Sequence, residues 1–139
     1  MSITIIEVKN KLLEPKKAHQ EDAGFDLCCS KRLELKPFEI VKAETGVKFS
    51  IPKGNVGFVL PRSSISLKGV LVHTGVIDCG YTGEISVVLQ NLTNQTVIFK
   101  RYNRIAQLVV TPLTGLTLVQ GTLSTDTDRG EGGFGSSGE

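Results

Sequence analysis

The chain has 139 residues, the size of one domain, which is long enough to bury a core without a disulfide or a metal. Its formal net charge of +2, with six Phe, two Tyr and no Trp, is too small for a nucleic-acid surface, which would need a basic stripe interleaved with aromatic residues. The three cysteines, with Cys28 and Cys29 adjacent, form neither a disulfide framework nor the paired spacing of a zinc site.

No apolar run approaches the length of a membrane span, and the N-terminus lacks a charged-then-apolar signal pattern. Together with the cysteine usage, this predicts a soluble intracellular protein, in the cytoplasm or the nucleus, that does not bind a membrane. Many short runs of Val, Ile, Leu and Thr, punctuated by 15 glycines, predict an all-β sandwich or barrel. The expected strands are Ile3–Val8, Leu33–Lys36, Ile40–Lys42, Val47–Ile51, Val56–Leu60, Val70–His73, Thr96–Phe99, Arg104–Thr111 and Leu116–Val119.

The first chemical candidate is Asp26, in the stretch AGFDL that follows the polar connection Lys9–Gln20. Gly24 permits a backbone conformation that other residues resist. In an extended segment Asp26 points to the opposite face from Phe25 and Leu27. A lone Asp beside a turn can either cap the backbone or bind a ligand, and both readings stay open here.

The strand pattern breaks at Pro61–Gly69, PRSSISLKG. Arg62 carries a guanidinium fork, and Ser63 and Ser64 supply hydroxyls and N–H groups at the expected first turn of a short helix. This set suits a phosphate group. The structural alternative is a serine N-cap, which is compatible with an anion site.

The stretch Gly75–Glu84, GVIDCGYTGE, predicts a β-hairpin with Asp78 and Tyr81 at its rim. Beyond it, a strand is expected with Ile85, Val87 and Leu89 on one face and Ser86, Val88 and Gln90 on the other. The Asp78 carboxylate could orient a water, and the Tyr81 ring could pack on a sugar or base. The alternative is a polar turn without a chemical role. His73, just before this stretch, is more often a solvated or packing residue than a base.

Gln107 lies inside the apolar strand Arg104–Thr111 and therefore needs a hydrogen-bond partner, which could be another strand or a ligand oxygen. The tail, residues 124–139, has no core-forming residue except Phe134 and is rich in glycine. It is either a disordered end or a mobile cover for a nucleotide. The second reading rests on four side chains that can pair phosphates or stack on a base, Arg129, Phe134, Ser136 and Ser137.

Five segments in order, AGFDL, PRSSISLKG, GVIDCGYTGE, RIAQL and RGEGGFGSSG, resemble the five signature motifs of the homotrimeric dUTP pyrophosphatase (dUTPase) family. The resemblance spans residues 23 to 138. It implies a jelly-roll-like β-barrel over residues 1–123 and a flexible C-terminal tail, residues 124–139, that closes the active site. It also implies a homotrimer whose active sites are shared between chains. The implied reaction converts dUTP to dUMP and pyrophosphate, which keeps uracil out of DNA and supplies dUMP for thymidylate synthesis.

The resemblance also implies a role for each motif residue. Asp78 would position the attacking water, Tyr81 would pack under the deoxyribose, and Asp26 would reach Mg²⁺ through the water shell of the ion. Arg104 would form a structural ion pair. The implied phosphate contacts are Arg62, Ser63, Ser64 and Gln107, with Arg129, Ser136 and Ser137 at the γ-phosphate. Phe134 would stack on uracil, and the remaining substrate contacts would be Val72, His73, Gly75, Ile77 and Gly135.

Two departures from the family pattern accompany this resemblance. The segment Val70–Thr74 is short and has no Asn, so backbone groups would read the uracil edge. That shortness is also compatible with a virus-encoded protein. Ser137 stands where Thr is common, a change that keeps the hydroxyl. Two other functions remain as alternatives, a dCTP deaminase of the same fold and a non-catalytic nucleotide-binding trimer that acts through protein partners.

Overall fold

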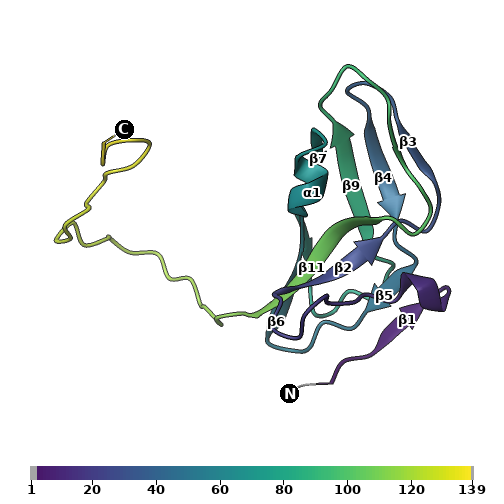
Figure 1. Ribbon diagram of the computed structural model, residues 1–139. Helices are drawn as coiled ribbons and strands as arrows, with labels where there is room; N and C mark the ends of the chain where they lie inside the picture. Colours follow the sequence, from purple (N-terminus) through teal and green to yellow (C-terminus); the bar gives the residue numbers. More distant parts are fainter. Residues whose placement is uncertain (1–2, 139) are drawn as a thin grey trace.

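The computed structural model describes residues 3–138, in which the regular secondary structure is almost entirely β-strand (Figure 1). The strands are β1 (Ile6–Val8), β2 (Gly24–Cys28), β3 (Leu33–Leu35), β4 (Ile40–Glu44), β5 (Val47–Phe49), β6 (Asn55–Leu60), β7 (Val70–Val72), β8 (Gly75–Ile77), β9 (Ser86–Asn91), β10 (Val97–Phe99) and β11 (Arg104–Pro112). Two helical turns, η1 (Lys11–Leu13) and α1 (Ser63–Ser66), interrupt them. Within residues 3–138 no helix is long and apolar enough to cross a membrane.

All strand pairings are antiparallel, and the longest strand, β11, holds the largest sheet together. That sheet has the order β2-β11-β6-β8, and a second sheet has the order β4-β9-β7. Two further pairs, β1-β5 and β10-β3, complete the fold. The all-β class predicted from the short apolar runs is therefore confirmed.

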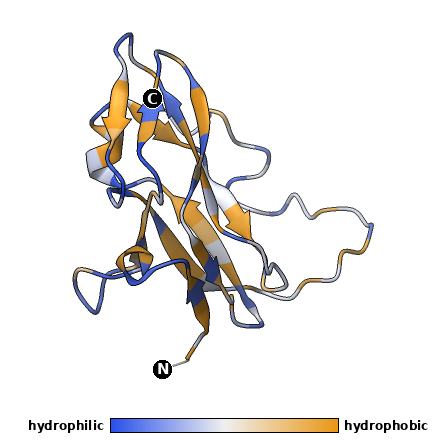
Figure 2. Cartoon of the chain, turned by 90° about the vertical axis from the view of Figure 1, so that its right-hand side faces the viewer, coloured by the Kyte–Doolittle hydropathy of each residue, from blue (hydrophilic) through white to orange (hydrophobic). Residues whose placement is uncertain are grey.

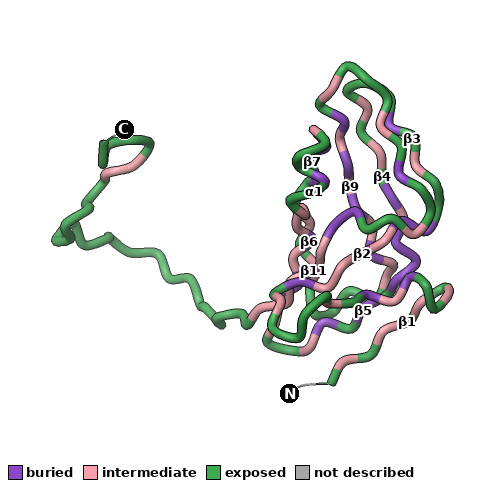
Figure 3. The backbone as a smooth tube through the Cα atoms, viewed as in Figure 1, coloured by how far each residue is buried: buried purple, intermediate pink, exposed green. Residues whose placement is uncertain are grey.

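The core lies between the sheets and forms one cluster, seen as the buried stretches in Figure 3. The alternation predicted for residues 85 to 90 is confirmed, because Ile85, Val87 and Leu89 are fully buried. From β11, Ile105 and Leu108 join the same cluster. Figure 2 shows the apolar residues concentrated on these strands, with polar residues in the connections.

The hairpin predicted for Gly75–Glu84 is wrong. Strand β8 pairs with β6, whereas β9 pairs with β4 and β7, so the connection of residues 78–85 leads from one sheet to the other. The alternation of side chains locates a strand correctly, but it carries no information about which distant strand completes the hydrogen bonds. Asp78 and Tyr81 consequently lie on a crossover between sheets.

The prediction of a strand at Leu116–Val119 is also wrong, because the single chain forms no strand there. Residues 113–123 are extended but pair with no strand among the described residues, and Leu116, Leu118 and Val119 are almost fully exposed. The stretch Leu116–Val119 combines two leucines with the β-branched Thr117 and Val119, a composition typical of a strand, yet the described part of this chain provides no neighbour for it. Figure 1 shows this part of the chain leading away from the barrel.

Asn91, at the end of β9, generates a stability prediction. It is fully buried, and its Nδ2 lies 3.0 Å from the carbonyl of Leu35, 3.2 Å from that of Lys36 and 2.7 Å from that of Gln95. Asn91→Ala should lower the free energy of unfolding by about 2 kcal/mol or more, because buried acceptors lose their donor. Denaturant titration measures it, with the exposed Asn94→Ala as control. Equal stability of both variants would contradict this role.

Candidate active site

The first candidate region is the Asp26 cluster, formed by Asp26, Arg62, Arg104 and Gln107 where β2, β11 and β6 lie side by side. Arg62 Nε lies 3.0 Å from Asp26 Oδ1, and Arg104 Nη1 lies 3.4 Å from Asp26 Oδ2. The carboxylate therefore serves as an ion-pair acceptor for two guanidinium groups. The ion pair predicted for Arg104 is confirmed, and its partner is Asp26.

The short helix predicted after Pro61 is confirmed as α1. Arg62 occupies the N-cap position and no side chain caps the helix, so the alternative role of Ser63 or Ser64 as N-cap does not apply. Both serines are exposed, and Ser64 Oγ lies 3.4 Å from Arg62 Nη1. The turn thus presents two hydroxyls beside a guanidinium, a set able to bind an anion.

The partner of Gln107, left open by the sequence, is a backbone group. Its Nε2 donates a 2.9 Å hydrogen bond to the carbonyl of Pro61, at the end of β6. The conformational freedom expected of Gly24 is not used, since its φ is not in the left-handed region. Gly24 is instead required by proximity, because a Cβ there would lie 2.9 Å from Gln107 Cδ and overlap Oε1.

Burial raises the pKa of the Cys28 thiol, although Arg104 acts in the opposite direction. Cys28 lies two residues beyond Asp26 on β2 and lines the same hollow of about 280 Å³. The thiol is therefore neutral at pH 7 and adds no negative charge beside the carboxylate. All three cysteines are free, in agreement with the sequence.

The second candidate region is the Asp78 hollow, an open cavity of about 470 Å³. Asp78 is exposed, and the backbone N–H of Tyr81 donates to the backbone carbonyl of Asp78 at 3.1 Å. The Tyr81 hydroxyl donates to the carbonyl of Glu84 at 2.8 Å, which fixes the ring. The residues lining the hollow are Lys42, Glu44, Val76, Ile77, Asp78, Tyr81, Glu84 and Ser86.

Sequence reasoning missed Lys42, Glu44, Glu84 and Ser86 as part of this hollow. They come from β4, β9 and the crossover before β9, and the only signal in the sequence was the polar side of the β9 alternation. Glu84 also lies 2.9 Å from Lys9, and this hydrogen-bonded carboxylate raises the Lys9 pKa. The ion pair ties the crossover to the end of β1.

In the neighbouring segment Val72–Gly75, backbone groups are more available than side chains for contact with a ligand. Val72 is buried, Gly75 is half-buried, and His73 is exposed. The His73 Nε2 lies 3.2 Å from Gln90 Oε1, so the imidazole has a surface amide as its partner. The interpretation of His73 as a packing or solvated residue agrees with this contact.

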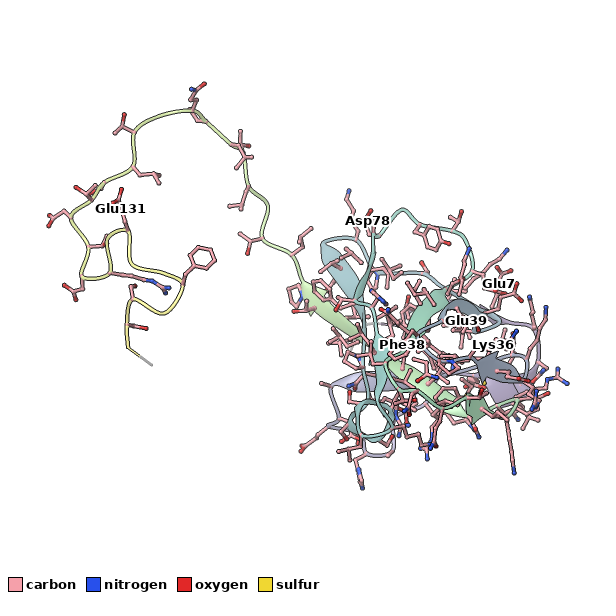
Figure 4. The ribbon with its side chains drawn as sticks, turned by 90° about the horizontal axis from the view of Figure 1, so that it is seen from above. Glu7, Lys36, Phe38, Glu39, Asp78 and Glu131 are labelled. Atoms are coloured by element: carbon pink, nitrogen blue, oxygen red, sulfur yellow. The ribbon has the colours of Figure 1, made fainter. Side chains whose placement is uncertain are left out.

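The tail residues lie apart from both regions. Residues 113–131 and 134–138 are exposed, and Figure 4 shows Glu131 far from Asp78 on the barrel. Among the described residues, Arg129 forms its side-chain hydrogen bond within the tail, through Nε to the carbonyl of Gly132 at 2.8 Å, and Phe134 is fully exposed. Gly135, Ser136 and Ser137 are likewise remote from the barrel. The chain therefore carries the predicted site in three separate parts.

The residues of the Asp26 cluster fit a Mg²⁺ ion that keeps its waters and is held in part by the phosphates of a ligand. Within residues 3–138 no three His, Cys, Asp or Glu side chains lie close enough to hold a metal. Asp26 is the single carboxylate of the cluster, and its oxygens already face Arg62 and Arg104. A carboxylate has capacity for further acceptor contacts, and Mg²⁺ often keeps its waters while phosphates and one or two carboxylates hold it. The donor set fits an ion brought by a phosphorylated ligand.

These features define an all-β protein with a partial anion site on one side and an exposed carboxylate beside a tyrosine on another. The family model described as dUTPase matches residues 11–138, and the chain belongs to the dUTPase family. A relative from Clostridium novyi (strain NT), "Deoxyuridine 5'-triphosphate nucleotidohydrolase", is 38% identical over 141 residues, covering 99% of each chain.

Solved structures give the same result. A variant of the Staphylococcus bacteriophage 80alpha dUTPase with dUpNHpp superposes with a TM-score of 0.92 at 28% identity, covering 100% of both chains. A variant of the dUTPase from phage phi11 of S. aureus has a TM-score of 0.81 at 25% identity, covering 88% of this chain and 99% of that one. That structure is described as revealing the coordination of a structural Mg(II) ion. The recognised family and the fold are therefore confirmed.

Gly83 generates a prediction about the Asp78 hollow. A Cβ at position 83 would overlap the Tyr81 hydroxyl and lie 2.6 Å from Cζ, so Gly83→Ala should displace the ring. We expect the KM for dUTP to rise severalfold, on the order of 1 kcal/mol of lost contact. The control is Gly80→Ala, because a Cβ at Gly80 meets nothing within 4 Å. Equal KM values in both variants would contradict the positioning of Tyr81 by Gly83.

Proposed function

We infer that this protein is a dUTP diphosphatase, which hydrolyses dUTP to dUMP and pyrophosphate. The observation that carries the inference is the full-length match to dUTP nucleotidohydrolases, with the residues of the five motifs retained. Incubation with dUTP, dCTP, dTTP and UTP, with pyrophosphate and ammonia as readouts, tests it. Pyrophosphate from dUTP alone is expected. Ammonia from dCTP would instead identify a deaminase, and no product from any nucleotide would identify a binding protein.

For the chemical step, we propose Asp78 as the group that orients the attacking water and accepts its proton. Its carboxylate is exposed in the hollow and has no salt-bridge partner among residues 3–138, so it is available as a base. Tyr81 would pack beneath the deoxyribose and leave no room for a 2′-hydroxyl. Its hydroxyl is already bound to the carbonyl of Glu84, which leaves the ring face as the contact surface.

The triphosphate would be bound by Arg62, Ser63 and Ser64, with Gln107 beside them. Four or more negative charges on a nucleoside triphosphate need cations, and Arg62 and Arg104 supply two in the Asp26 cluster. Asp26 would hold Mg²⁺ through its waters, and the bound ion would supply charge neutralisation on the phosphate oxygens. Attack at the α-phosphorus then releases pyrophosphate into this cationic surrounding.

Recognition of the base would depend on the segment Val72–Ile77, through backbone groups, with Phe134 stacking on uracil. The absence of an Asn side chain in Val70–Thr74 supports a backbone reading of the uracil edge. Gly75 and Ile77 lie on β8, directly before Asp78, so a nucleoside bound there would present its phosphates next to the carboxylate.

We also propose that the active protein is a homotrimer with shared sites. One chain keeps its three site parts separate, and residues 113–123 expose apolar side chains that a second copy could cover. The barrel would comprise residues 1–123 and the covering tail residues 124–139. Residues 1, 2 and 139 of this division lie outside the described range. Closure would bring Arg129, Ser136 and Ser137 to the terminal phosphates.

The role of Asp78 yields a direct prediction. Asp78→Asn should lower kcat by about 100-fold or more while leaving the dissociation constant for dUTP nearly unchanged, because the amide keeps the shape and loses the base. Steady-state kinetics and calorimetric titration with dUTP measure the two quantities. Weaker binding with an unchanged turnover of bound substrate would contradict this assignment.

The tail yields a second prediction. Deleting residues 125–139 should abolish most dUTP hydrolysis without lowering the melting temperature, because described residues of the tail bury no apolar side chain in the barrel. Turnover and thermal melting are measured on the same preparation. Near-normal turnover, or a large fall in melting temperature, would show that the tail is not a cover.

Subunit mixing provides the control for this deletion. Mixed oligomers of Asp78→Asn and tail-deleted chains should regain part of the activity, because some shared sites would then collect an intact carboxylate and an intact tail. Light scattering gives the oligomeric state of each sample. An active monomer, or no recovery on mixing, would contradict the shared site.

A further inference from the structure

The Asp26 cluster contains a contact whose role goes beyond binding phosphate directly. Gln107 lies in the middle of β11, where its register partners are Asp26 on β2 and Leu60 on β6. It therefore sits between the strand that carries the carboxylate and the strand that leads into the Arg62 turn. A side chain at this position can influence both neighbours at once.

The amide of Gln107 is committed to the chain itself. Its Nε2 donates to the Pro61 carbonyl at 2.9 Å, and its Oε1 lies over the backbone of Gly24. Pro61 is the last residue before Arg62, whose φ of −100° and ψ of 142° are extended and precede the first turn of α1. Fixing the Pro61 carbonyl therefore fixes the peptide plane from which Arg62 begins.

Arg62 is the residue whose orientation matters in this turn. Its Nε lies 3.0 Å from Asp26 Oδ1, and its Nη1 lies 3.4 Å from both Ser64 Oγ and the Arg104 carbonyl. These contacts require the guanidinium to leave the backbone in one direction. A rotation of the Pro61 to Arg62 peptide would move the guanidinium and both serines together.

The second requirement for this position of the Gln107 side chain is the absence of a side chain at Gly24. Gly24 is buried, and a Cβ there would lie 3.0 Å from Gln107 Cβ, 2.9 Å from its Cδ, and overlap its Oε1. The glutamine cannot move away without losing the Pro61 carbonyl. The glycine thus provides space for a side chain, since its own backbone is ordinary β-strand.

We propose that Gln107 is a positioning residue, which orients the Arg62–Ser64 turn through the Pro61 carbonyl, and that Gly24 leaves the space this amide needs. The proposal deepens the proposed dUTPase function and rests on it for the kinetic consequence. A phosphate contact made by Gln107 itself would act independently of Arg62. Positioning acts through Arg62, and a double-mutant cycle separates the two.

The test uses Gln107→Met, which keeps the length of the side chain and removes the donor. We expect the KM for dUTP to rise roughly tenfold, with a smaller change in kcat, because a single hydrogen bond that orients binding groups is lost. In an Arg62→Met/Ser63→Ala/Ser64→Ala background the same substitution should change the KM by less than about twofold. Gln95→Met, at an exposed position of the β9–β10 turn, is the control. A tenfold change in both backgrounds would overturn the proposal.

A second measurement needs no substrate. Ile65 N–H and Ser66 N–H donate to the Arg62 carbonyl at 3.0 Å and 3.1 Å, and their backbone hydrogen exchange should be faster in Gln107→Met and in Gly24→Ala than in the wild type, while thermal melting shows that Gln107→Met remains folded. Gly24→Ala/Gln107→Ala should exchange no faster than Gln107→Ala, because the overlap with Cδ and Oε1 is then removed and only the 3.0 Å approach to the Cβ of residue 107 remains. Unchanged exchange in Gln107→Met would overturn the proposal. Absence of dUTP hydrolysis in the wild type would instead refute the proposed function, and the exchange result would still decide the positioning role.

Discussion

The arrangement of the candidate site depends on the place of β11 between β2 and β6. Two antiparallel ladders run along this one strand, and they bring together residues that are distant in sequence. Asp26, Gln107 and Leu60 form one row across the sheet, and the chain leaves that row at Pro61 to form the turn that carries Arg62, Ser63 and Ser64. The hydrogen bonds of the ladders fix the row, so the ion pair joins a carboxylate on the sheet, Asp26, to the turn that directly follows β6, which carries Arg62.

Much of the fold could be predicted from the sequence, because side-chain alternation and turn residues are local properties. The buried face of Ile85, Val87 and Leu89 and the helix after Pro61 are examples. The pairing of β8 with β6 could not be predicted, since both β8 and β9 offer apolar faces and hydrogen-bonding edges to any neighbour. The order of strands in a barrel is decided by contacts between remote segments.

The site shows the same division between local and distant information. The motif residues Asp26, Arg62 and Asp78 were selected as candidates from their residue types and from the family resemblance. The partner of Gln107 was not, because a backbone carbonyl leaves no trace in the sequence. Gly24 was identified as special for the wrong reason. Its value lies in the space that it leaves for the glutamine, which only the neighbouring strand reveals.

The central place of β11 also sets the order in which the protein can fold as it is synthesised. Strand β2 leaves the ribosome early, but the partner that completes its hydrogen bonds is the last strand of the barrel. Until that strand emerges, β2 has an unpaired edge, and edges of this kind can pair with other chains. The long sequence separation between β2 and β11 also favours slow folding after release.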